Sequence, residues 1–211
     1  MPRWIPTAKW EGLDVFVIGG GVSLENFDWN LLKNECTVGC NDAHLLGAET
    51  CKICIFGDPK WFRKHQHSLV KYEGLLLTNH GEFQRTKFDW LWTLPRKANG
   101  LATDALAWNA NTGASAVNLA LILGAKRIFL LGFDMHLSNE RQNWHENLLN
   151  KPDKAVYQKF IEGFGRLSKS LNKVFPGREI VNVTDNSSMN CFPKINCKQF
   201  WDERKNYEAF I

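Results

Sequence analysis

The stretch that most constrains the fold of this chain covers residues 13–24, with the sequence LDVFVIGGGVSL. Residues 15–18 are apolar without alternation, and a strand with two apolar faces is usually buried in a parallel sheet between helices. Gly19, Gly20 and Gly21 follow directly, and Ser23 is suitably placed to cap a helix through residues 25–32. A strand, a glycine turn and a helix start bring backbone N–H groups close to a phosphate, and the helix dipole adds to the attraction. The stretch therefore predicts a cradle for a nucleotide phosphate.

This glycine turn departs from the dinucleotide-binding fingerprint. The fingerprint has glycine at its sixth position, where this chain has Leu24. It also has an acidic residue about 20 residues further on, and Asp42 stands near that distance. NAD binding therefore stays an alternative, and we expect it to be weak. A turn without a ligand is a further interpretation, although three consecutive glycines cost backbone entropy that a plain turn need not spend.

Length and charge restrict the class of protein. A chain of 211 residues suits one domain with a real core, and its composition is ordinary apart from nine tryptophans. The net charge of +4 is too small to indicate nucleic-acid binding, and it is compatible with phosphorylated partners. No apolar run approaches the roughly 18 residues of a membrane span, and the N-terminus has no apolar core for a signal peptide. We therefore expect a cytoplasmic protein.

The cysteines are expected to be reduced and structural, without zinc. Cys51 and Cys54 form a CxxC motif, but no second CxxC or paired histidine follows at zinc spacing. Residues 51–58 are predicted to form a buried strand, in which positions three apart face opposite sides, so the two thiols would not share a metal. Reduced cysteines in a chain without a signal peptide agree with the cytosol.

Strands and helices alternate along the chain, which predicts a single α/β domain with a Rossmann-like, mostly parallel sheet and helices on both faces. Strands are expected at residues 14–19, 35–41, 51–58, 74–79, 127–131 and 178–183, and helices at 61–71, 113–123 and 153–172. Thr112 stands at the cap position of the second of these helices. Residues 81–111 show no clean period, so we expect an inserted loop, lid or small lobe there, followed later by a C-terminal tail at 186–211.

Polar residues gather where the predicted strands end. These ends carry Gly19 to Ser23, Asn41 with Asp42, Gly57 with Asp58, Thr78 with Asn79, and Asp134. In parallel α/β sheets, ligands bind outside the carboxyl ends of the strands. The sequence therefore predicts a polar pocket at this edge of the sheet.

Three segments of the chain resemble two related bacterial families. The segments are VFVIGGGVSLENFDWNLL, TVGCN and NTGASAVNLALILGAKRIFLLGFDM. They are similar to the CMP-sialic-acid-dependent sialyltransferases that act on lipooligosaccharide, and to the 6-hydroxymethylpterin pyrophosphokinase-like family. The second family includes motility accessory factors tied to flagellin glycosylation. The later segment NVTDNSSMNCFPKI is similar to phage-encoded members of this broader group.

The resemblance implies a set of donor-binding residues. The positions that match the nucleotide-binding motifs are Gly19, Gly21, Ser23, Asn41, Thr112, Gly113, Ala114, Gly132 and Asp134, with Gly20 in the same turn. The glycine turn and Ser23 would contact phosphates, Asn41 the donor nucleotide, and residues 112–114 the cytidine and phosphate. The sialyltransferases use a histidine in a later loop as general base, and its best match is His145 in NWHENLL. Their phosphate-assisting tyrosines have no clear match among Tyr72, Tyr157 and Tyr207.

Two acidic residues are further candidates. Asp134 follows the apolar run FLLGF, where a carboxylate must be satisfied by a partner, and it is taken as catalytic together with His145. Asp58, in FGDPKWF, could bind a sugar hydroxyl, a ribose hydroxyl or a metal. It could equally cap a helix that begins at Pro59.

Two reactions and one role without turnover follow from these residues. The leading reaction is transfer of a sugar from a nucleotide-activated donor, such as a CMP-linked one, to a hydroxyl on a glycan, protein or modified nucleic acid. His145 would be the base, and no cofactor or metal is required. The alternative is pyrophosphoryl transfer to a pterin-like alcohol, which needs Mg²⁺ near Asp134 and Asp58. The third is a phage accessory or assembly protein, and a homo-oligomer is compatible with all three.

Overall fold

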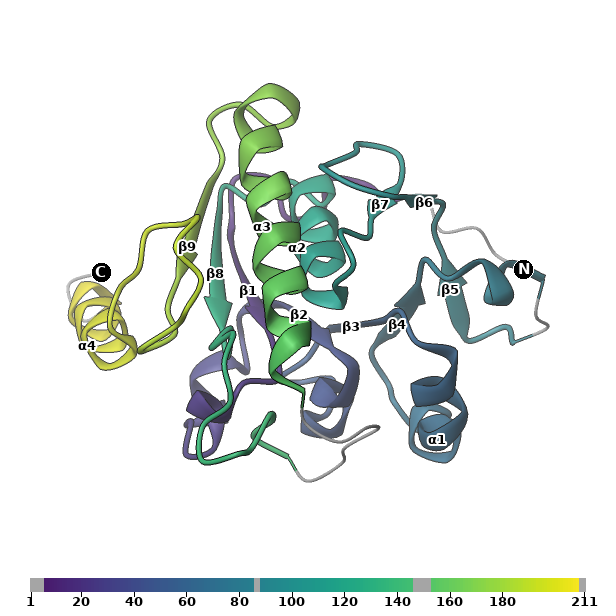
Figure 1. Cartoon of the computed structure of the whole chain (residues 1–211), viewed down its shortest axis with the longest axis horizontal. Coiled ribbons are helices and arrows are strands. Elements are labelled where there is room, and N and C mark those ends of the chain that lie inside the picture. The colour runs from purple at the N-terminus through teal and green to yellow at the C-terminus, as the bar shows by residue number, and fades with distance from the viewer. Residues whose placement is uncertain (1–5, 86–87, 146–152, 209–211) are drawn as a thin grey trace.

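The computed structural model describes residues 6–85, 88–145 and 153–208, and a seven-stranded parallel sheet runs through its centre (Figure 1). The strands are β1 (Asp14–Ile18), β2 (Cys36–Cys40), β3 (Ile53–Phe56), β4 (Leu75–Thr78), β5 (Leu91–Thr93), β8 (Arg127–Leu131) and β9 (Glu179–Asn182). Their order is β5-β4-β3-β2-β1-β8-β9, and each neighbouring pair is parallel. The chain therefore builds outward from β1 in one direction and then returns to β1 to build in the other. Ligands of such sheets bind at this switch point, between β1 and β8.

Two hydrophobic cores cover the two faces of the sheet. Alternate residues of β1 serve different cores: Val15 and Val17 face one side, and Phe16 and Ile18 face the other. The first core is closed by α2 (Thr112–Ile122) and α3 (Lys154–Val174), with α3 lying along α2 (Figure 1). The second core is closed by α1 (Pro59–Leu69) and α4 (Cys197–Glu208). The predicted α/β class with helices on both faces is confirmed.

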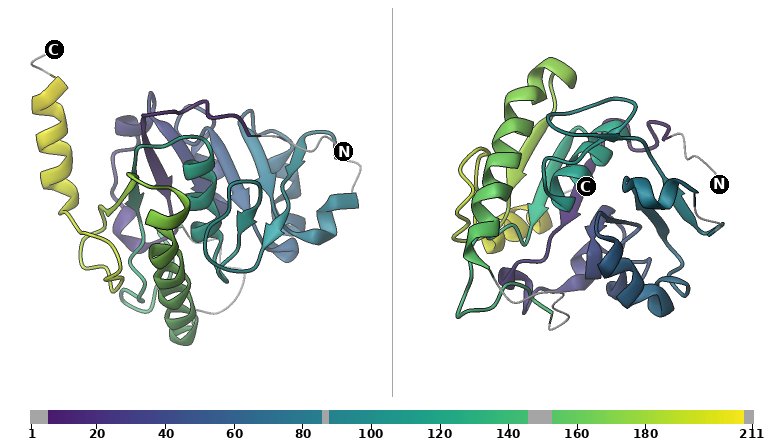
Figure 2. Two further views of the ribbon diagram at one scale, coloured as in Figure 1. Left: turned by 90° about the horizontal axis from the view of Figure 1, so that it is seen from above. Right: turned by 45° about the vertical axis from the view of Figure 1, so that its right-hand side comes forward.

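The C-terminal tail contains a helix that the sequence did not predict. Figure 2 shows α4 at the β9 end of the sheet, opposite to the β5 end. Trp201 stacks on Phe16 with ring centroids 5.3 Å apart, and Phe200 lies 4.7 Å from the ring of Phe129. These contacts fix α4 against β1 and β8.

Residues 81–111 contribute to the main sheet, which differs from the expectation of a loop, lid or lobe. Within this segment β5 pairs with β4 at the sheet edge, and β6 (Arg96–Lys97) pairs with β7 (Leu106–Ala107) in a separate two-stranded sheet. Buried Asn118 of α2 holds the segment, because its Oδ1 accepts from the amides of Ala102 and Ala107. Its Nδ2 donates to the carbonyl of Ala102 at 2.8 Å.

The expected helix after the three glycines is wrong. The chain forms two short 3₁₀ helices there, η1 (Val22–Leu24) and η2 (Trp29–Leu32). Ser23 does not cap a helix and instead donates to Asp134. One turn of 3₁₀ helix offers little dipole to a phosphate, so any cradle here depends on individual amides.

The expected cap of α2 and the expected geometry of the CxxC motif also need correction. Asn111, not Thr112, caps α2, because its Oδ1 accepts from the amides of Gly113 and Ala114. Cys51 precedes β3, so its side chain and that of Cys54 belong to the same core and do not face opposite sides. All six cysteines carry free thiols. In the described part of the chain no three His, Cys, Asp or Glu side chains are grouped to hold a metal, and no helix could cross a membrane.

Candidate functional site

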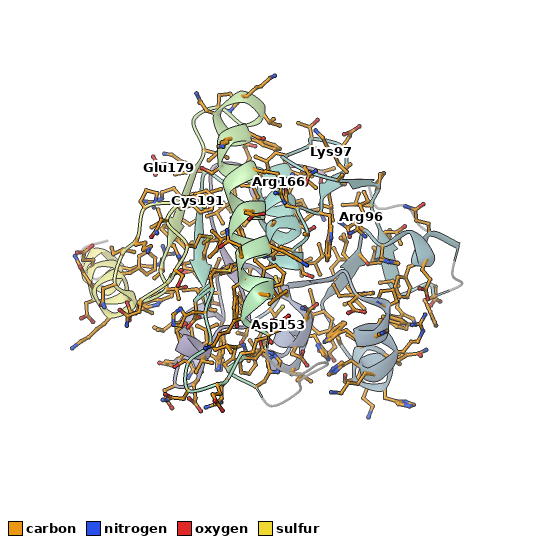
Figure 3. The ribbon with its side chains drawn as sticks, in the orientation of Figure 1. Arg96, Lys97, Asp153, Arg166, Glu179 and Cys191 are labelled. Carbon is orange, nitrogen blue, oxygen red and sulfur yellow. The ribbon has the colours of Figure 1, made fainter. Side chains whose placement is uncertain are left out.

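A cavity of about 500 Å³ opens at the carboxyl ends of β1, β2, β3 and β8. It lies at the switch point of the sheet, where the sequence predicts a polar pocket. The predicted site residues that line it are Gly19, Gly20, Gly21, Asn41, Asp58, Thr112, Gly113, Gly132, Asp134 and His145. Ser23 and Ala114 are not part of the lining, and Ala114 is fully buried within α2. The amino-terminal part of α3 closes another wall, and Figure 3 shows its cap residue Asp153 at that end of the helix.

Two of the three glycines are explained by contact with the end of β8. A Cβ at Gly21 would lie 1.6 Å from Oδ2 of Asp134, and a Cβ at Gly19 would lie 2.6 Å from the carbonyl of Gly132. The amides of Gly19 and Gly21 donate to the carbonyls of Leu131 and Gly132, each at 2.8 Å. These two glycines therefore serve close backbone packing and have no free N–H for a phosphate.

Gly20 is different from its neighbours. Its amide donates to no protein group in the described ranges, and a Cβ there would meet only the side-chain tip of Asn143, at 2.9 Å. Its carbonyl accepts from the amide of Trp144 at 2.9 Å. The turn thus keeps one N–H at the cavity wall that is available to a ligand.

Asp134 and Asp58 are both engaged in the fold. The carboxylate of Asp134 accepts from the amide of Ser23 at 3.0 Å and from its hydroxyl at 2.9 Å, so it ties the glycine turn to the end of β8. Asp58 is the N-cap of α1, because its Oδ1 accepts from the amide of Lys60 at 2.7 Å. Both carboxylates still line the cavity.

Asn41 lines the cavity and carries a buried acceptor without a partner among the described residues. Its backbone is left-handed, with φ of 53°, a conformation that asparagine tolerates better than most residues. Its carbonyl accepts from the Cys54 thiol at 3.2 Å and from Nδ1 of His44 at 3.0 Å, and these bonds hold the unusual conformation. The side-chain Oδ1 is buried without a protein partner among the described residues. A buried acceptor without a partner costs about 1–3 kcal/mol, which a ligand N–H or O–H would offset.

His145 lies in a cluster of buried polar side chains on the other wall of the cavity. Its side chain is 10% exposed, and its Nε2 lies 3.6 Å from Oδ2 of Asp42. Oδ1 of Asp42 lies 3.5 Å from Nε2 of His65, and Oδ2 accepts from the indole N–H of Trp61 at 2.9 Å. We call these four residues, Asp42, Trp61, His65 and His145, the Asp42 cluster. The carboxylate that lies beside His145 is therefore that of Asp42.

Burial lowers the pKa of His145 below the ordinary histidine value, although the charge of Asp42 opposes this effect. The neighbouring groups His65, Lys64 and His44 lower it further. The imidazole is therefore neutral at pH 7 and able to accept a proton. The backbone of the loop is held by Trp144, whose indole N–H donates to the carbonyl of Gly19 at 3.3 Å.

Several residues that line the cavity were missing from the predicted site, and two of them, Asp42 and Tyr157, carry groups that bear on its chemistry. The sequence placed Asp42 beside Asn41 at a strand end and near the acidic position of the dinucleotide fingerprint, but Asp42 was not given a role in the site. Tyr157 was compared with the phosphate-assisting tyrosines without a clear match, and it was not assigned to the site. Asp153, Val156, Tyr157 and Phe160 line the cavity at the i, i+3, i+4, i+7 spacing of one helix face, so periodicity could have found it.

The hydroxyl of Tyr157 is buried without a partner in the described part of the protein. Burial raises the pKa of this phenol to about 12, and the nearby charge of Asp134 adds to the effect. Tyr157 is therefore a protonated donor at neutral pH, on the side of the cavity that carries Asp134.

Comparisons with known proteins agree on the fold. No protein-family profile matches the chain, and no curated protein matches its sequence. The MAf glycosyltransferase from Magnetospirillum magneticum AMB-1 superposes with a TM-score of 0.62 and 12% identity, over 92% of this chain and 35% of that chain. The second structure is the sialyltransferase CstII from Campylobacter jejuni, in complex with the substrate analogue cytidine-5'-monophosphate. It superposes with a TM-score of 0.53 and 18% identity, over 86% of this chain and 84% of that chain. The protein therefore shares its α/β fold with two glycosyltransferases and spans about a third of the length of the first.

Proposed function

We propose that this protein transfers a sugar from a nucleotide-activated donor to a hydroxyl acceptor. The observation that carries the proposal is the convergence of a neutral buried histidine, an unpartnered tyrosine hydroxyl and a free backbone amide on one cavity. These groups belong to His145, Tyr157 and Gly20. The volume of about 500 Å³ is that of a small-molecule site. The shared fold with two glycosyltransferases supports the same function.

The proposed reaction has one base and two hydrogen-bond donors for the leaving group. His145 takes the proton of the acceptor hydroxyl while the acceptor oxygen bonds to the anomeric carbon of the donor sugar. The bond from that carbon to the donor phosphate breaks, and its electron pair leaves with the phosphate. Negative charge develops on the phosphate oxygen, where the Tyr157 hydroxyl and the Gly20 amide would donate.

The nucleotide would occupy the wall formed by Asn41 and the start of α2. Oδ1 of Asn41 would accept from a donor group of the base or ribose. Thr112 and Gly113 line the adjacent wall, but the Gly113 amide is already bonded to Asn111, so contact there would involve side chain or van der Waals surface. A CMP-linked donor is the first to test, because CstII was solved with cytidine-5'-monophosphate.

One observation favours the Mg²⁺-dependent alternative. The described lining of the cavity contains four carboxylates, Asp42, Asp58, Asp134 and Asp153, and no Lys or Arg. A phosphate-rich ligand such as ATP would need a countercharge there. Mg²⁺ is commonly held by one or two carboxylates together with substrate phosphates, and Asp58 and Asp134 would fit that pattern. The ion would supply charge neutralisation, and Asp134 would still hold the glycine turn.

The experiment that tests the function follows nucleotide release from CMP-, UDP- and GDP-linked sugars and from ATP by phosphorus NMR, with Mg²⁺ or with EDTA. Water serves as the acceptor hydroxyl when no other acceptor is known. Glycosyl transfer predicts release from one donor sugar that persists in EDTA and is lost in His145→Ala. Release from ATP alone, abolished by EDTA and by Asp58→Asn, would favour pyrophosphoryl transfer. Release from none of these compounds would favour the role without turnover.

A cytoplasmic location belongs to the same proposal. The six cysteines are unpaired and three of them, Cys40, Cys51 and Cys54, are buried. Free thiols of this kind are typical of proteins in a reducing compartment.

A further inference from the structure

The Asp42 cluster contains a carboxylate that the fold does not satisfy by itself. Asp42 is 3% exposed, and within the described ranges its carboxylate accepts one hydrogen bond, from the Trp61 indole to Oδ2. Oδ1 has no hydrogen-bond partner among the described residues, although Nε2 of His65 lies 3.5 Å away. A buried carboxylate in this state is costly unless a positive charge or a further donor faces it.

The groups around this carboxylate come from three elements. From η3 (Asn41–Leu46) there is His44, whose Nδ1–H donates to the carbonyl of Asn41 and is thereby directed away from Asp42. From α1 there are Lys64 and His65, and from the loop after β8 there is His145. The distances of 3.5 Å and 3.6 Å from the two imidazoles to opposite oxygens show that His65 and His145 share one carboxylate.

We propose that Asp42 is the positioning residue for His145, and that His65 limits its effect by occupying the opposite carboxylate oxygen. The inference rests on the proposed function of His145 as the base. When His145 takes the proton of the acceptor hydroxyl, the O–H bond breaks, an N–H bond forms and the imidazole becomes a cation. Asp42 stays ionised and stabilises that cation through space, and the proton returns to solvent after the product leaves. Such a carboxylate makes a buried imidazole a stronger base than burial alone would allow.

Asp42→Asn tests the charge with little change of shape. Asparagine keeps an oxygen for the Trp61 indole but removes the negative charge. The pKa of His145 should then fall further below the ordinary histidine value, because burial is no longer opposed. The turnover number should fall roughly 10- to 100-fold, less than the 10²–10⁴ expected when the base itself is removed, while the KM for the donor stays unchanged.

His65→Gln is the matched control, and it should shift the pKa of His145 in the opposite direction. It removes the imidazole that faces the other oxygen, and His65 is one of the groups that lower the pKa of His145. The titration midpoint of His145 should therefore move up in this variant, whereas in Asp42→Asn it moves down. A merely structural role of the cluster would not move the two midpoints in opposite directions.

The closing experiment is a proton NMR titration of the imidazole C–H signals of the intact chain, as wild type, Asp42→Asn and His65→Gln. His145→Ala assigns the signal, and melting temperatures confirm that each variant is folded. Opposite shifts of the His145 midpoint, with a parallel shift of the acidic limb of the rate profile, are the expected result. An unchanged midpoint in both variants overturns the inference even if the transfer reaction is real. Opposite midpoint shifts with full turnover in His145→Ala overturn the proposed function instead, and with it the positioning role.

Discussion

The two ends of the strands in the central sheet, called here the amino edge and the carboxyl edge, differ in whether their polar groups have partners. At the amino edge, charges from different elements are paired. Oδ2 of Asp14 in β1 lies 2.7 Å from Nη2 of Arg127 and 3.1 Å from Nη1 of Arg204. Oε1 of Glu35 lies 2.7 Å from Nη2 of Arg204. At the carboxyl edge, Oδ1 of Asn41, Nδ1 of His145 and the hydroxyl of Tyr157 are buried without a partner among the described residues.

The presence or absence of partners for polar groups distinguishes a ligand site from a stabilising surface better than the volume of a hollow does. The amino edge has an open hollow of about 620 Å³, which is larger than the cavity of about 500 Å³ at the carboxyl edge. Asp14 and Glu35, which line this hollow, are nevertheless paired, and their bonds to Arg204 stabilise α4 against the sheet. Each unpaired buried group costs about 1–3 kcal/mol, so these groups, together with Oδ1 of Asp42, indicate a site that a ligand completes.

Removal of the base should give the largest functional effect. We expect His145→Ala to lower kcat by roughly 10²–10⁴ with little change in donor affinity, because the base contacts the acceptor. The wild-type rate should fall as the pH drops through an ionisation below the usual histidine range, since burial lowers the pKa of His145. This limb should vanish in the variant. His67→Ala, at an exposed position of α1, is the control, and full activity in His145→Ala would contradict the account.

The glycine turn offers a pair of variants with opposite outcomes. Gly21→Ala should destabilise the protein by roughly 1–3 kcal/mol, because the new Cβ would lie 1.6 Å from Asp134. Gly20→Ala should barely change stability, because its Cβ would meet only the side-chain tip of Asn143, but the added methyl group should hinder a phosphate that approaches the free Gly20 amide and so weaken nucleotide binding. Urea unfolding and calorimetric titration measure the two effects. Equal nucleotide affinity in Gly20→Ala and wild type would remove this turn from the binding site.

Tyr157→Phe should separate activity from stability. Loss of the hydroxyl should lower kcat about 10-fold, since one hydrogen bond to the departing phosphate is removed. Stability should be unchanged or slightly higher, because the buried hydroxyl has no protein partner in the described ranges. A melting curve and a rate on the same sample suffice. A clear loss of stability at unchanged rate would reassign Tyr157 to the core.

The histidines should also make stability depend on pH. Burial lowers the pKa of His44, His65 and His145, so the unfolded chain binds protons that the folded protein does not. Stability from these groups is complete above about pH 6.5 and is lost as the pH falls below it. Urea unfolding at pH 7.5 and 5.5 should show this loss, and His65→Gln should reduce it. A free energy of unfolding that does not change over this range would be inconsistent with neutral buried histidines.

The smallest effect is expected at the amino edge. Asp14→Asn should cost about 1 kcal/mol or less, because its partner Arg127 is 49% exposed and exposed ion pairs contribute little. Turnover and nucleotide affinity should stay at the wild-type values. A strong loss of activity in folded Asp14→Asn would erase the distinction between the two edges.

The predictable parts of the fold were those that local sequence determines. β1 and β8 are apolar runs ended by glycine, so both their position and their polar ends could be read from the sequence. β5 has three residues and is a strand only through its pairing with β4, which no local pattern records. The helix predicted after the glycines failed because Phe27 packs on Trp201 and Trp29 on Trp144, far along the chain, and these contacts override the local period.

The site likewise has parts that local sequence determines and parts that depend on contacts between distant segments. Strand ends gave Asn41, Asp58 and Asp134 because all carboxyl ends of a parallel sheet meet at one edge. The grouping of Asp42 with His65 and His145 depends on α1 and on a loop more than a hundred residues later. That grouping arises from tertiary structure, so the sequence shows the individual residues but not that they lie together.

The central claim is that the carboxyl-edge cavity binds a nucleotide, and calorimetric titration tests it most directly. CMP, UDP, GDP and ATP are titrated with and without Mg²⁺ into wild type, Gly20→Ala and Asp14→Asn. The account predicts that a nucleotide binds the wild type and Asp14→Asn equally and Gly20→Ala more weakly. No heat of binding from any of the four in the folded wild type, or equal affinity in all three proteins, would contradict it.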